Sequence, residues 1–329
     1  MTATVQDPQR SLPLIDLDGL DPASPRRAAI AAELDDAFRR IGFCYIVNTG
    51  IEQRLVDATF AASRAFHALS DAAKQAIAIN DFHRGYIAPK TSVIRSSSVA
   101  RVTQPNLSES FMAMHEVAPD DARYGEPLQG PNQWPGDLPG FRDAVTAYQD
   151  AMTAMAYRFT ALLARALGLR EDFFAAEFTR PTTWLRLLHY PPHPADAPAG
   201  QYGAAPHTDY GFITLLAQDE HGGLEVRARD GGWIAAPPVP GSFIVNVADM
   251  LARWSNDRWT STPHRVRNLS GADRYSLPFF YDPDTASRIA CLPTCSGADI
   301  PPRYEPVIYG DYVVERLNRN YAYRQQSRQ

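Results

Sequence analysis

Two histidines and one aspartate in the second half of the chain could together bind a metal ion. His207 and Asp209 stand one residue apart in Pro-His-Thr-Asp-Tyr, and His264 follows in Ser-Thr-Pro-His-Arg-Val. On a β-strand, residues i and i+2 point to the same face, so the side chains of the first pair could reach one ion. Two imidazoles and one carboxylate suit ferrous iron with open coordination positions, or zinc. The His-x-Asp pair alone is a weak signal, because chance produces it often.

An arginine and a serine beyond His264 could bind an anion. Arg274 and Ser276 belong to the run Arg-Tyr-Ser-Leu-Pro-Phe-Phe, which is typical of a strand, so they share one face, which we take as the pocket face. A guanidinium inside a β-core needs an anion and can hold a carboxylate through two parallel hydrogen bonds, to which Ser276 can add a third. A structural ion pair with a carboxylate of the protein is the alternative. Beside the metal set, the pair predicts a bound small carboxylic acid.

The elements that must position these residues are short strands. After Pro181, apolar and β-branched runs alternate with Gly, Pro and Asp. The predicted strands cover residues 184–190, 211–218, 224–228, 233–235, 242–247, 264–268 and 275–281. Many short strands with turn signals between them predict a sandwich or jelly roll.

The first 180 residues predict mainly helices. Apolar residues at helical spacing indicate one helix capped by Ser24 and ended by Gly42, and another that begins after the cap Ser70. Further helices are predicted at residues 53–69, 141–167, 171–178 and 310–321, and strands at 11–18 and 43–48. Residues 81–111 show no periodicity and predict a loop, either a lid or binding loop or a solvated surface loop. The methionines of the long helix are expected to fill the core.

Composition excludes several classes of protein. The 329 residues are 45% hydrophobic and 21% charged, which is typical of a globular protein, and the net charge of -5 argues against a nucleic-acid partner. No apolar stretch approaches the roughly 20 residues of a membrane helix, and the N-terminus lacks the apolar segment of a secretory signal. Three cysteines predict no disulfide framework, with Cys291 and Cys295 as ordinary thiols. We expect a cytoplasmic location, no membrane contact and no evident protein partner.

The region from residue 184 to residue 282 resembles the iron(II)/2-oxoglutarate-dependent dioxygenases, in the subgroup similar to isopenicillin N synthase and the plant hydroxylases. The order His-x-Asp, His, Arg-x-Ser matches at His207, Asp209, His264, Arg274 and Ser276. The stretches 189–192, 223–226, 246–249 and 254–256, with 13–17 and 42–48 near the N-terminus, are also similar, so the resemblance covers most of the chain. It implies an α+β fold, with a double-stranded β-helix (jelly-roll, cupin-like) core flanked by helices. The expected parts are a helix-rich region (1–120), connecting helices (121–180), the catalytic core (181–285) and a C-terminal helical segment (286–329), in one integrated domain.

The resemblance also implies what each matched residue does. His207, Asp209 and His264 would bind Fe(II). Arg274 and Ser276 would bind the distal carboxylate of 2-oxoglutarate, and Tyr190 would add a hydroxyl group. Plant members carry Asn two residues before that tyrosine, whereas Leu188 stands here, which removes only an auxiliary contact. With O2, 2-oxoglutarate would be converted to succinate and CO2 while a small-molecule substrate is hydroxylated or desaturated.

The matched motifs do not identify the substrate. The resemblance offers four candidates for contacting it: Arg84 and Tyr86, in a segment similar to a substrate-facing Arg-Gly-Tyr region of the family, and Phe111 and Phe280, next to pocket walls of relatives. The basic residues Lys90, Arg95 and Arg101 suggest an anionic group on the substrate, although a solvated loop explains them equally well. Two other functions stay open. One is an oxidase like isopenicillin N synthase, which uses Arg-x-Ser to hold the substrate's own carboxylate and needs no 2-oxoglutarate. The other is a zinc hydrolase or a non-catalytic binding protein on the same core.

Overall fold

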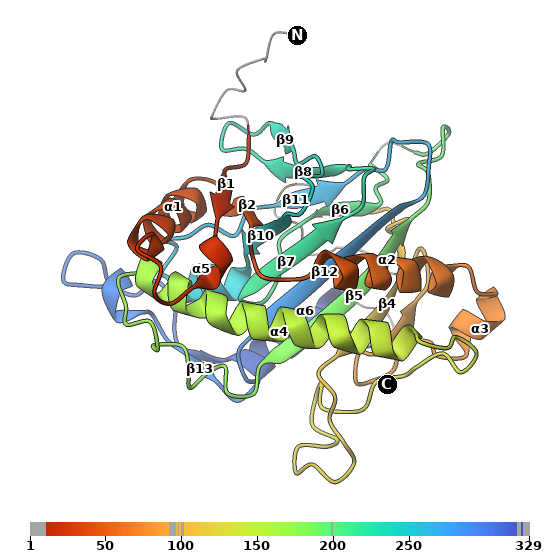
Figure 1. Ribbon diagram of the computed structural model, residues 1–329, viewed down its shortest axis with the longest axis horizontal. Helices are drawn as coiled ribbons and strands as arrows, with labels where there is room; N and C mark the ends of the chain where they lie inside the picture. Colours follow the sequence, from red (N-terminus) through yellow and green to blue (C-terminus); the bar gives the residue numbers. More distant parts are fainter. Residues whose placement is uncertain are drawn as a thin grey trace.

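The computed structural model describes residues 11–91, 97, 99, 102–198, 200–320 and 324, so Arg95 and Arg101 lie outside the described residues. Two sheets form the core (Figure 1). The larger sheet has eight strands in the order β1-β2-β10-β7-β12-β5-β4-β3. These are β1 (Leu14–Asp16), β2 (Phe43–Val47), β3 (Gly85–Ile87), β4 (Glu109–Met114), β5 (Thr182–Tyr190), β7 (Ile213–Gln218), β10 (Phe243–Val247) and β12 (Arg274–Asp282).

The smaller sheet has four strands in the order β6-β11-β8-β9. These are β6 (Ala204–His207), β8 (Leu224–Arg227), β9 (Trp233–Ala235) and β11 (His264–Val266), while β13 (Arg288–Ile289) pairs with β14 (Val307–Ile308). Residues from both sheets line one pocket, which is the arrangement expected of a double-stranded β-helix. The predicted jelly-roll core flanked by helices is confirmed.

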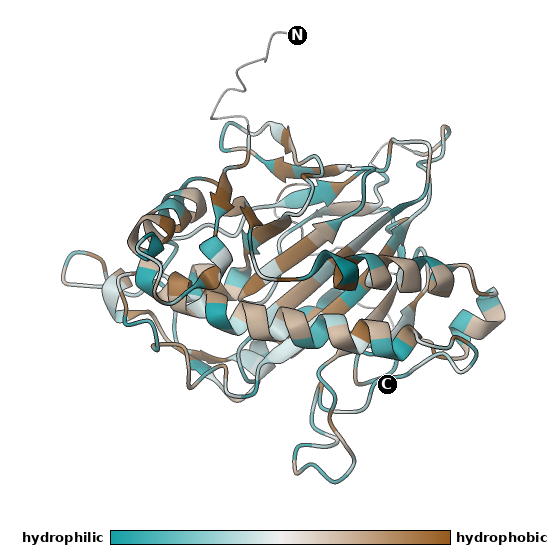
Figure 2. Ribbon diagram, viewed as in Figure 1, coloured by the Kyte–Doolittle hydropathy of each residue, from teal (hydrophilic) through white to brown (hydrophobic). Residues whose placement is uncertain are grey.

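Helices cover one face of the larger sheet, where α4 runs across it beside α2 (Figure 1). The described helices are α1 (Arg27–Arg40), α2 (Gln53–His67), α3 (Asp71–Gln75), α4 (Phe141–Ala166), α5 (Asp249–Trp254) and α6 (Tyr309–Asn320), with short 3-10 turns η1 (Asp18–Leu20) and η2 (Pro293–Cys295). Unlike α2 and α4, helix α6 lies on the pocket side of the sheet. Apolar residues concentrate on the central strands, whereas the helices mix polar and apolar residues (Figure 2). Within the described residues, none of the helices combines the length and apolar character needed to span a membrane.

The long helix α4 forms because its apolar residues repeat at helical spacing. Val145, Tyr148, Met152, Met155 and Phe159 are all buried, so they form a single stripe against the sheet and the neighbouring helices. The prediction that these methionines belong to the core is confirmed.

A glycine makes the sharp return from α1 into β2. Gly42 has φ +71°, and a Cβ atom at this position would lie 2.0 Å from the carbonyl oxygen of Thr260. Both the left-handed backbone and the close approach require glycine. The next residues enter β2, which pairs with β10 beside the pocket.

Several element predictions are wrong. Residues 171–178 form turns rather than a helix, because Phe174 and Phe178 pack into an aromatic cluster with Phe212. The predicted loop 81–111 contains β3 and the start of β4, all of whose residues are buried, so no alternation of polar and apolar residues marks them. The first long helix begins at Arg27 without a side-chain cap, although the Ser24 hydroxyl accepts a hydrogen bond from the Arg26 amide. Strand β6 and helix α5 were not predicted.

Candidate active site

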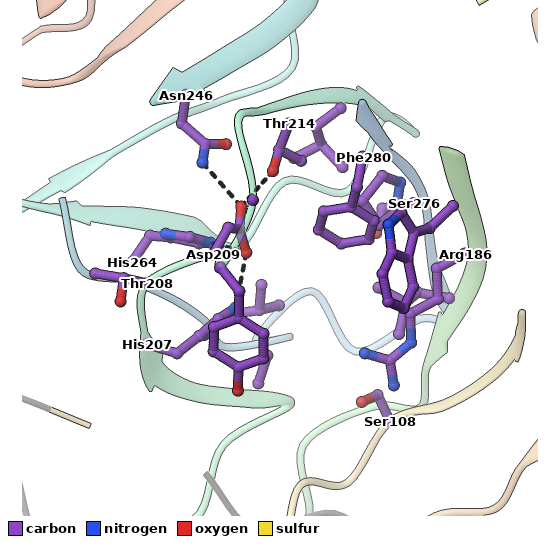
Figure 3. Close-up of a pocket in the computed structure, with 18 of the residues that line it drawn as sticks. Ser108, Arg186, His207, Thr208, Asp209, Thr214, Asn246, His264, Ser276 and Phe280 are labelled. Carbon is purple, nitrogen blue, oxygen red and sulfur yellow. Dashed lines mark hydrogen bonds and ion pairs between the residues drawn. The ribbon is translucent and has the colours of Figure 1, made fainter. Parts of the chain in front are cut away.

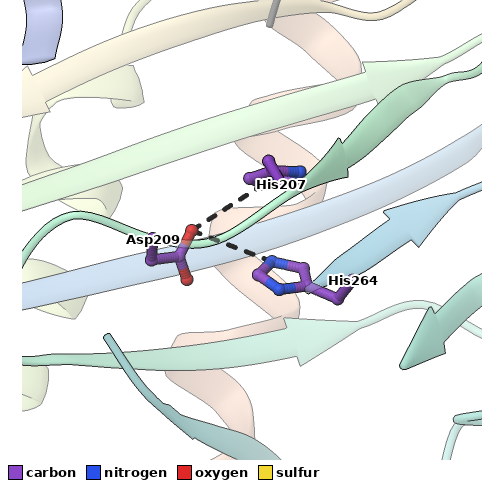
Figure 4. A group of neighbouring side chains, drawn as sticks. All are labelled: His207, Asp209 and His264. Atoms are coloured by element: carbon purple, nitrogen blue, oxygen red, sulfur yellow. Dashed lines mark ion pairs between the residues drawn. The ribbon is translucent and has the colours of Figure 1, made fainter. Parts of the chain in front are cut away.

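His207, Asp209 and His264 come together at one end of the smaller sheet (Figure 4). His207 is the last residue of β6 and is directly paired with His264, the first residue of β11, so the two imidazole centroids lie 4.3 Å apart. Asp209 lies in the loop after β6 rather than on the strand, which corrects the premise that the pair shares a strand face. Its Oδ1 atom lies 3.7 Å from Nε2 of His207 and 3.8 Å from Nε2 of His264.

Both imidazoles are oriented by backbone carbonyl groups. Nδ1 of His207 lies 2.7 Å from the Ala205 oxygen, and Nδ1 of His264 lies 3.2 Å from the Thr262 oxygen. If each Nδ1–H donates to its carbonyl, each Nε2 keeps a free lone pair that points toward Asp209. This tautomer is the one that metal-binding histidines use.

The Asp209 carboxylate is held by two neighbouring side chains. Its Oδ2 atom accepts hydrogen bonds from the hydroxyl of Thr214 (2.5 Å) and the amide of Asn246 (2.8 Å), as Figure 3 shows. Burial alone would raise the pKa of Asp209, but the charges of the two histidines and these hydrogen bonds outweigh it and lower the pKa. Oδ1 is therefore left as an ionised ligand atom on the side of the histidines.

Burial also acts on the first histidine. It lowers the pKa of His207 to about 4, assisted by the nearby charge of His264 and, more weakly, by that of Arg186. A neutral imidazole is the form that binds a metal. Two neutral nitrogens and one carboxylate oxygen, with one ligand atom of each residue within 4.8 Å of the others, fit the three-ligand set of a non-haem ferrous site.

Arg274 forms a second centre deeper in the larger sheet. Its side chain is fully buried, and one Nη atom donates to Oε1 of Gln218 at 3.0 Å. Within the described part of the chain, its Nε and other Nη atoms are buried without a hydrogen-bond partner. A buried guanidinium with unpaired donors is costly unless an anion binds it, so this centre fits a carboxylate ligand.

Two predicted partners of Arg274 lie beside it. Strand pairing sets Arg274 opposite Tyr190 and Ser276 opposite Leu188. The Tyr190 ring lies 4.7 Å beneath the guanidinium carbon, and Ser276 is buried on the same face of β12. Strand pairing thus places the face of the Tyr190 ring and the hydroxyl group of Ser276 on the same side of the sheet as the Arg274 guanidinium.

One pocket, with a cavity volume of about 160 Å³, contains both centres. Alternate residues of adjacent strands form its floor: Trp184, Arg186, Leu188 and Tyr190 of β5, Arg274, Ser276, Pro278, Phe280 and Asp282 of β12, and Thr214 and Leu216 of β7. Val313, Leu317 and Asn320 of α6 contribute a wall. The triad lies on one side of the pocket and Phe280 and Arg186 on the other (Figure 3).

Of the four residues predicted to contact substrate, the structure brings only Phe280 to this pocket. The Arg84 guanidinium is buried and donates to the carbonyls of Phe82, Leu128 and His115. The Tyr86 hydroxyl donates to Glu109, and Phe111 packs against the ring of Phe66. These three side chains stabilise the fold. The resemblance of a short segment to a family motif did not show whether these side chains face the pocket or lie away from it.

Several residues that line the pocket have no function predicted from their sequence pattern. They are Thr214 and Asn246, which hold Asp209, the wall residues Asn106, Ser108 and Arg186, and the three residues of α6. Arg186 could have been found, because β5 alternates with period two and position 186 shares a face with Tyr190. Asn246 was noted only as part of a similar stretch.

Comparison with known proteins agrees with this geometry. Residues 181–283 match the model of the 2OG-Fe(II) oxygenase superfamily, and residues 12–137 match that of the non-haem dioxygenase in morphine synthesis N-terminal region. Kihadalactone A synthase LFS of Citrus sinensis is 34% identical over 94% of this chain and 93% of its own. The chain belongs to the iron(II)/2-oxoglutarate-dependent dioxygenases. The family prediction is confirmed.

Other members are similar along the whole chain. The 2-oxoglutarate-Fe(II) type oxidoreductase hxnY of Emericella nidulans is 34% identical over 94% of this chain and 90% of its own. A full-length Neurospora crassa protein, crystallised in complex with alpha-KG and thymine, superposes with a TM-score of 0.84 at 30% identity, covering 97% of this chain and 99% of that one. This protein is therefore an Fe(II)- and 2-oxoglutarate-dependent oxidoreductase.

The chain's own residues have limited chemical tasks in such an enzyme. Ferrous iron, 2-oxoglutarate and O2 supply the oxidising chemistry when bound. The protein binds and orients them, neutralises the carboxylate of the cosubstrate and encloses the substrate in a largely apolar pocket.

Proposed function

We propose that His207, Asp209 and His264 bind the iron, and that Arg274 and Ser276 bind the distal carboxylate of 2-oxoglutarate. The observation that carries this proposal is the pair of complementary centres in one pocket. One centre offers three ligand atoms that converge, and the other is a buried guanidinium with unpaired donors. Tyr190 supports the second centre through its ring, and Phe280 forms part of the substrate wall.

The substrate of the oxidation is, in our proposal, a small molecule that is hydroxylated or desaturated. The pocket volume of about 160 Å³ supports this, because it suits a small ligand better than a segment of polymer. Related crystal structures hold small molecules too: the Neurospora crassa protein is in complex with thymine or 5-formyluracil, and JOX2 with JA. The oxidase that needs no 2-oxoglutarate is disfavoured, because solved relatives of this chain contain alpha-KG or 2OG.

The assignment is tested by anaerobic titration of the protein with Fe(II) and then with 2-oxoglutarate. The metal-to-ligand charge-transfer band reports chelation of the cosubstrate. We expect His207→Ala to bind neither iron nor, therefore, 2-oxoglutarate. Arg274→Met should bind iron normally but need at least about 100-fold more 2-oxoglutarate, as expected when a buried charged hydrogen-bond partner is removed.

The control is Arg170→Met, which changes an arginine that is 85% exposed and paired with Asp172. It should behave like the wild type in both titrations. Full succinate production by His207→Ala, or unchanged 2-oxoglutarate affinity in Arg274→Met, would contradict the respective assignment.

A further inference from the structure

Arg186 is a charged side chain in the pocket that neither the iron centre nor the 2-oxoglutarate centre uses. It lies in the middle of β5, and its Nε donates to the hydroxyl of Ser110 on β4 at 2.8 Å. Considering only the described residues, no carboxylate lies within ion-pair distance of Arg186, and its one hydrogen bond to a side chain is the bond to Ser110. The two terminal nitrogens of its guanidinium are thus available to a ligand.

The strand register shows where this guanidinium lies relative to the two centres. Arg186 faces Met112 on β4, and on β12 it falls between the pairs Ser276–Leu188 and Phe280–Trp184. Along the strand direction, Arg186 therefore lies two residues from the Ser276–Leu188 pair, which is about 7 Å at the rise of a β-strand. Thr214, which holds the iron ligand Asp209, is on β7, two strands across from β5, or roughly 10 Å.

Arg186 therefore points into the pocket from the side opposite the candidate iron ligands, as Figure 3 shows. A molecule between Arg186 and the triad would have one end at the guanidinium and the other near the metal. It would not displace 2-oxoglutarate from Arg274.

The surroundings of Arg186 select the chemistry of such a molecule. Met112 is paired with Arg186 across β4 and β5, and the pocket is further lined by the apolar side chains of Trp184, Phe280, Val313 and Leu317. The hydroxyl of Ser108 lies beside the guanidinium (Figure 3). Because Ser110 takes the Nε hydrogen, the plane of the guanidinium is fixed and its terminal edge can form two parallel hydrogen bonds. A carboxylate satisfies that edge and the positive charge together, whereas a neutral oxygen satisfies only the hydrogen bonds.

We propose that Arg186 binds the carboxylate of the substrate, and that the substrate is a small monocarboxylic acid with an apolar body. The acid group lies at Arg186, the body packs against Phe280 and α6, and a C–H bond at the far end faces the iron centre. This inference rests on the proposed function. The sequence suggested an anionic group on the substrate from Lys90, Arg95 and Arg101; this inference places that group at Arg186.

The test uses the anaerobic Fe(II)·2-oxoglutarate protein and matched pairs of probes. The acids are benzoate, indole-3-acetate and octanoate, each compared with its primary amide, and thymine serves as a further neutral probe. Perturbation of the charge-transfer band gives the Kd of each probe, and succinate release in air shows which probes stimulate turnover. We expect at least one acid to bind at least tenfold more tightly than its amide.

Variants then connect that preference to Arg186. Arg186→Met should raise the Kd of the preferred acid at least tenfold, while the Kd of its amide and of 2-oxoglutarate stays unchanged. Arg186→Lys should recover part of the affinity, because it keeps the charge without the planar fork. Ser110→Ala should weaken the acid less than Arg186→Met does, and Arg170→Met should have no effect.

Each other outcome is decisive. The proposal is wrong if no acid of the panel binds, if amides or thymine bind as tightly as the acids, or if Arg186→Met leaves the preference intact. A parallel loss of 2-oxoglutarate affinity in Arg186→Met would overturn it as well, because Arg186 would then belong to the cosubstrate site. Failure of the wild type to bind Fe(II) or 2-oxoglutarate would instead refute the proposed function, so the two failures are distinguishable.

Discussion

The two oxygens of Asp209 face different partners. Oδ2 receives the hydroxyl of Thr214 and the amide of Asn246, and Oδ1 faces the two imidazoles. The neighbouring strands β7 and β10 therefore fix which oxygen can bind a metal. Outer partners of this kind orient a ligand before the metal arrives, which reduces the free-energy cost of binding.

We expect Thr214→Val to weaken Fe(II) binding by about 10- to 100-fold, the range seen when an outer partner of a metal ligand is removed. The change keeps the shape of the side chain and removes only the hydroxyl donor to Oδ2. Fe(II) titration monitored by calorimetry measures the effect. Thr153→Val is the control, since Thr153 bonds only the Gln149 carbonyl in its own helix, and it should leave the Kd unchanged. Equal affinities in both variants would show that the hydroxyl does not support the ligand.

We expect the substitution Arg274→Met to have opposite effects on the stability of the protein and on its binding of 2-oxoglutarate. The buried charge of Arg274 has unpaired donors in the absence of an anion, so Arg274→Met should leave the thermal midpoint of the cosubstrate-free protein equal or higher. In the wild type, 2-oxoglutarate should raise the midpoint, and in Arg274→Met it should not. Thermal unfolding with and without the cosubstrate measures both effects. A large destabilisation of the variant without 2-oxoglutarate would indicate that the arginine has a structural function instead.

Residue types and order were sufficient to predict that His207, Asp209 and His264 come together and share a pocket with Arg274 and Ser276. Their functions as ligands remain a prediction. The same reasoning was insufficient for Arg84, whose guanidinium binds three carbonyl groups of the fold. An arginine in an irregular segment looks the same in sequence whether it binds a ligand or the backbone. Only the three-dimensional packing distinguishes the two, and it places Arg186, together with Arg274, in the pocket.

At the scale of elements, the C-terminal helix α6 has an unexpected connection to the pocket. Val313 and Leu317 are buried and line it, although they stand far from the jelly-roll strands in sequence. The helix is attached by the ion pair of Arg316 with Asp249 at 3.3 Å, and by the amide of Asn320, 2.5 Å from the Tyr210 hydroxyl. Asp249 and Tyr210 lie close in sequence to the ligand loop and to Asn246. The helix thus connects the substrate wall with the region of the metal ligands.

We expect Leu317→Ala to loosen α6 specifically. Truncation of a buried leucine typically costs about 2–5 kcal/mol, and for a terminal helix much of that cost should appear as local opening. Hydrogen exchange of the amides of residues 309–320 should accelerate, with a smaller change in β5 and β12. Glu315→Ala is the matched control, because its side chain is 63% exposed on the same helix. Acceleration spread evenly over the core strands would contradict a local function of Leu317.

Element prediction succeeded where the pattern of one element is self-contained. Helix α4 and the strands β5 and β12 have long, regular apolar patterns, and their predicted positions are correct within a few residues. It failed where neighbours decide the structure. Strand β4 lies between β3 and β5 and is buried on both faces, and residues 171–178 adopt turns in which two phenylalanines join an aromatic cluster. Such tertiary effects leave no periodic signal in sequence.

At the scale of the whole molecule, a buried charge network joins the helical layer to the face of the larger sheet that lies away from the pocket. Glu109 of β4 accepts hydrogen bonds from Lys74 of α3 at 2.9 Å, from Nδ1 of His189 at 2.8 Å and from the Tyr86 hydroxyl. Burial would raise the pKa of Glu109, but these hydrogen bonds outweigh it and lower the pKa to about 2. The hydrogen bonds and charges of Glu109 and Asp273 likewise outweigh burial and raise the pKa of His189.

The sign of the pH dependence follows from these shifts. A carboxyl group whose pKa is lower in the folded than in the unfolded protein stabilises the fold above its unfolded pKa. For Glu109 the ordinary value is 4.5, so its contribution of about 3 kcal/mol is present above pH 4.5 and is lost as the pH falls toward 2. For His189 the contribution is present below its ordinary value of 6.5 and is lost as the pH rises through its raised pKa.

We therefore expect Glu109→Gln to lower the free energy of unfolding by about 3 kcal/mol at pH 6, with a deficit that shrinks steadily below pH 4.5. The substitution removes the negative charge between Lys74 and His189 while keeping the size of the side chain. Urea unfolding of wild type and variant, measured at pH 6 and at the lowest pH where both refold reversibly, gives the two differences. Glu126→Gln, an exposed glutamate, is the control and should be neutral at both pH values. A deficit that is the same at both pH values would mean that packing rather than charge accounts for it, and that the network does not carry the acid sensitivity of the fold.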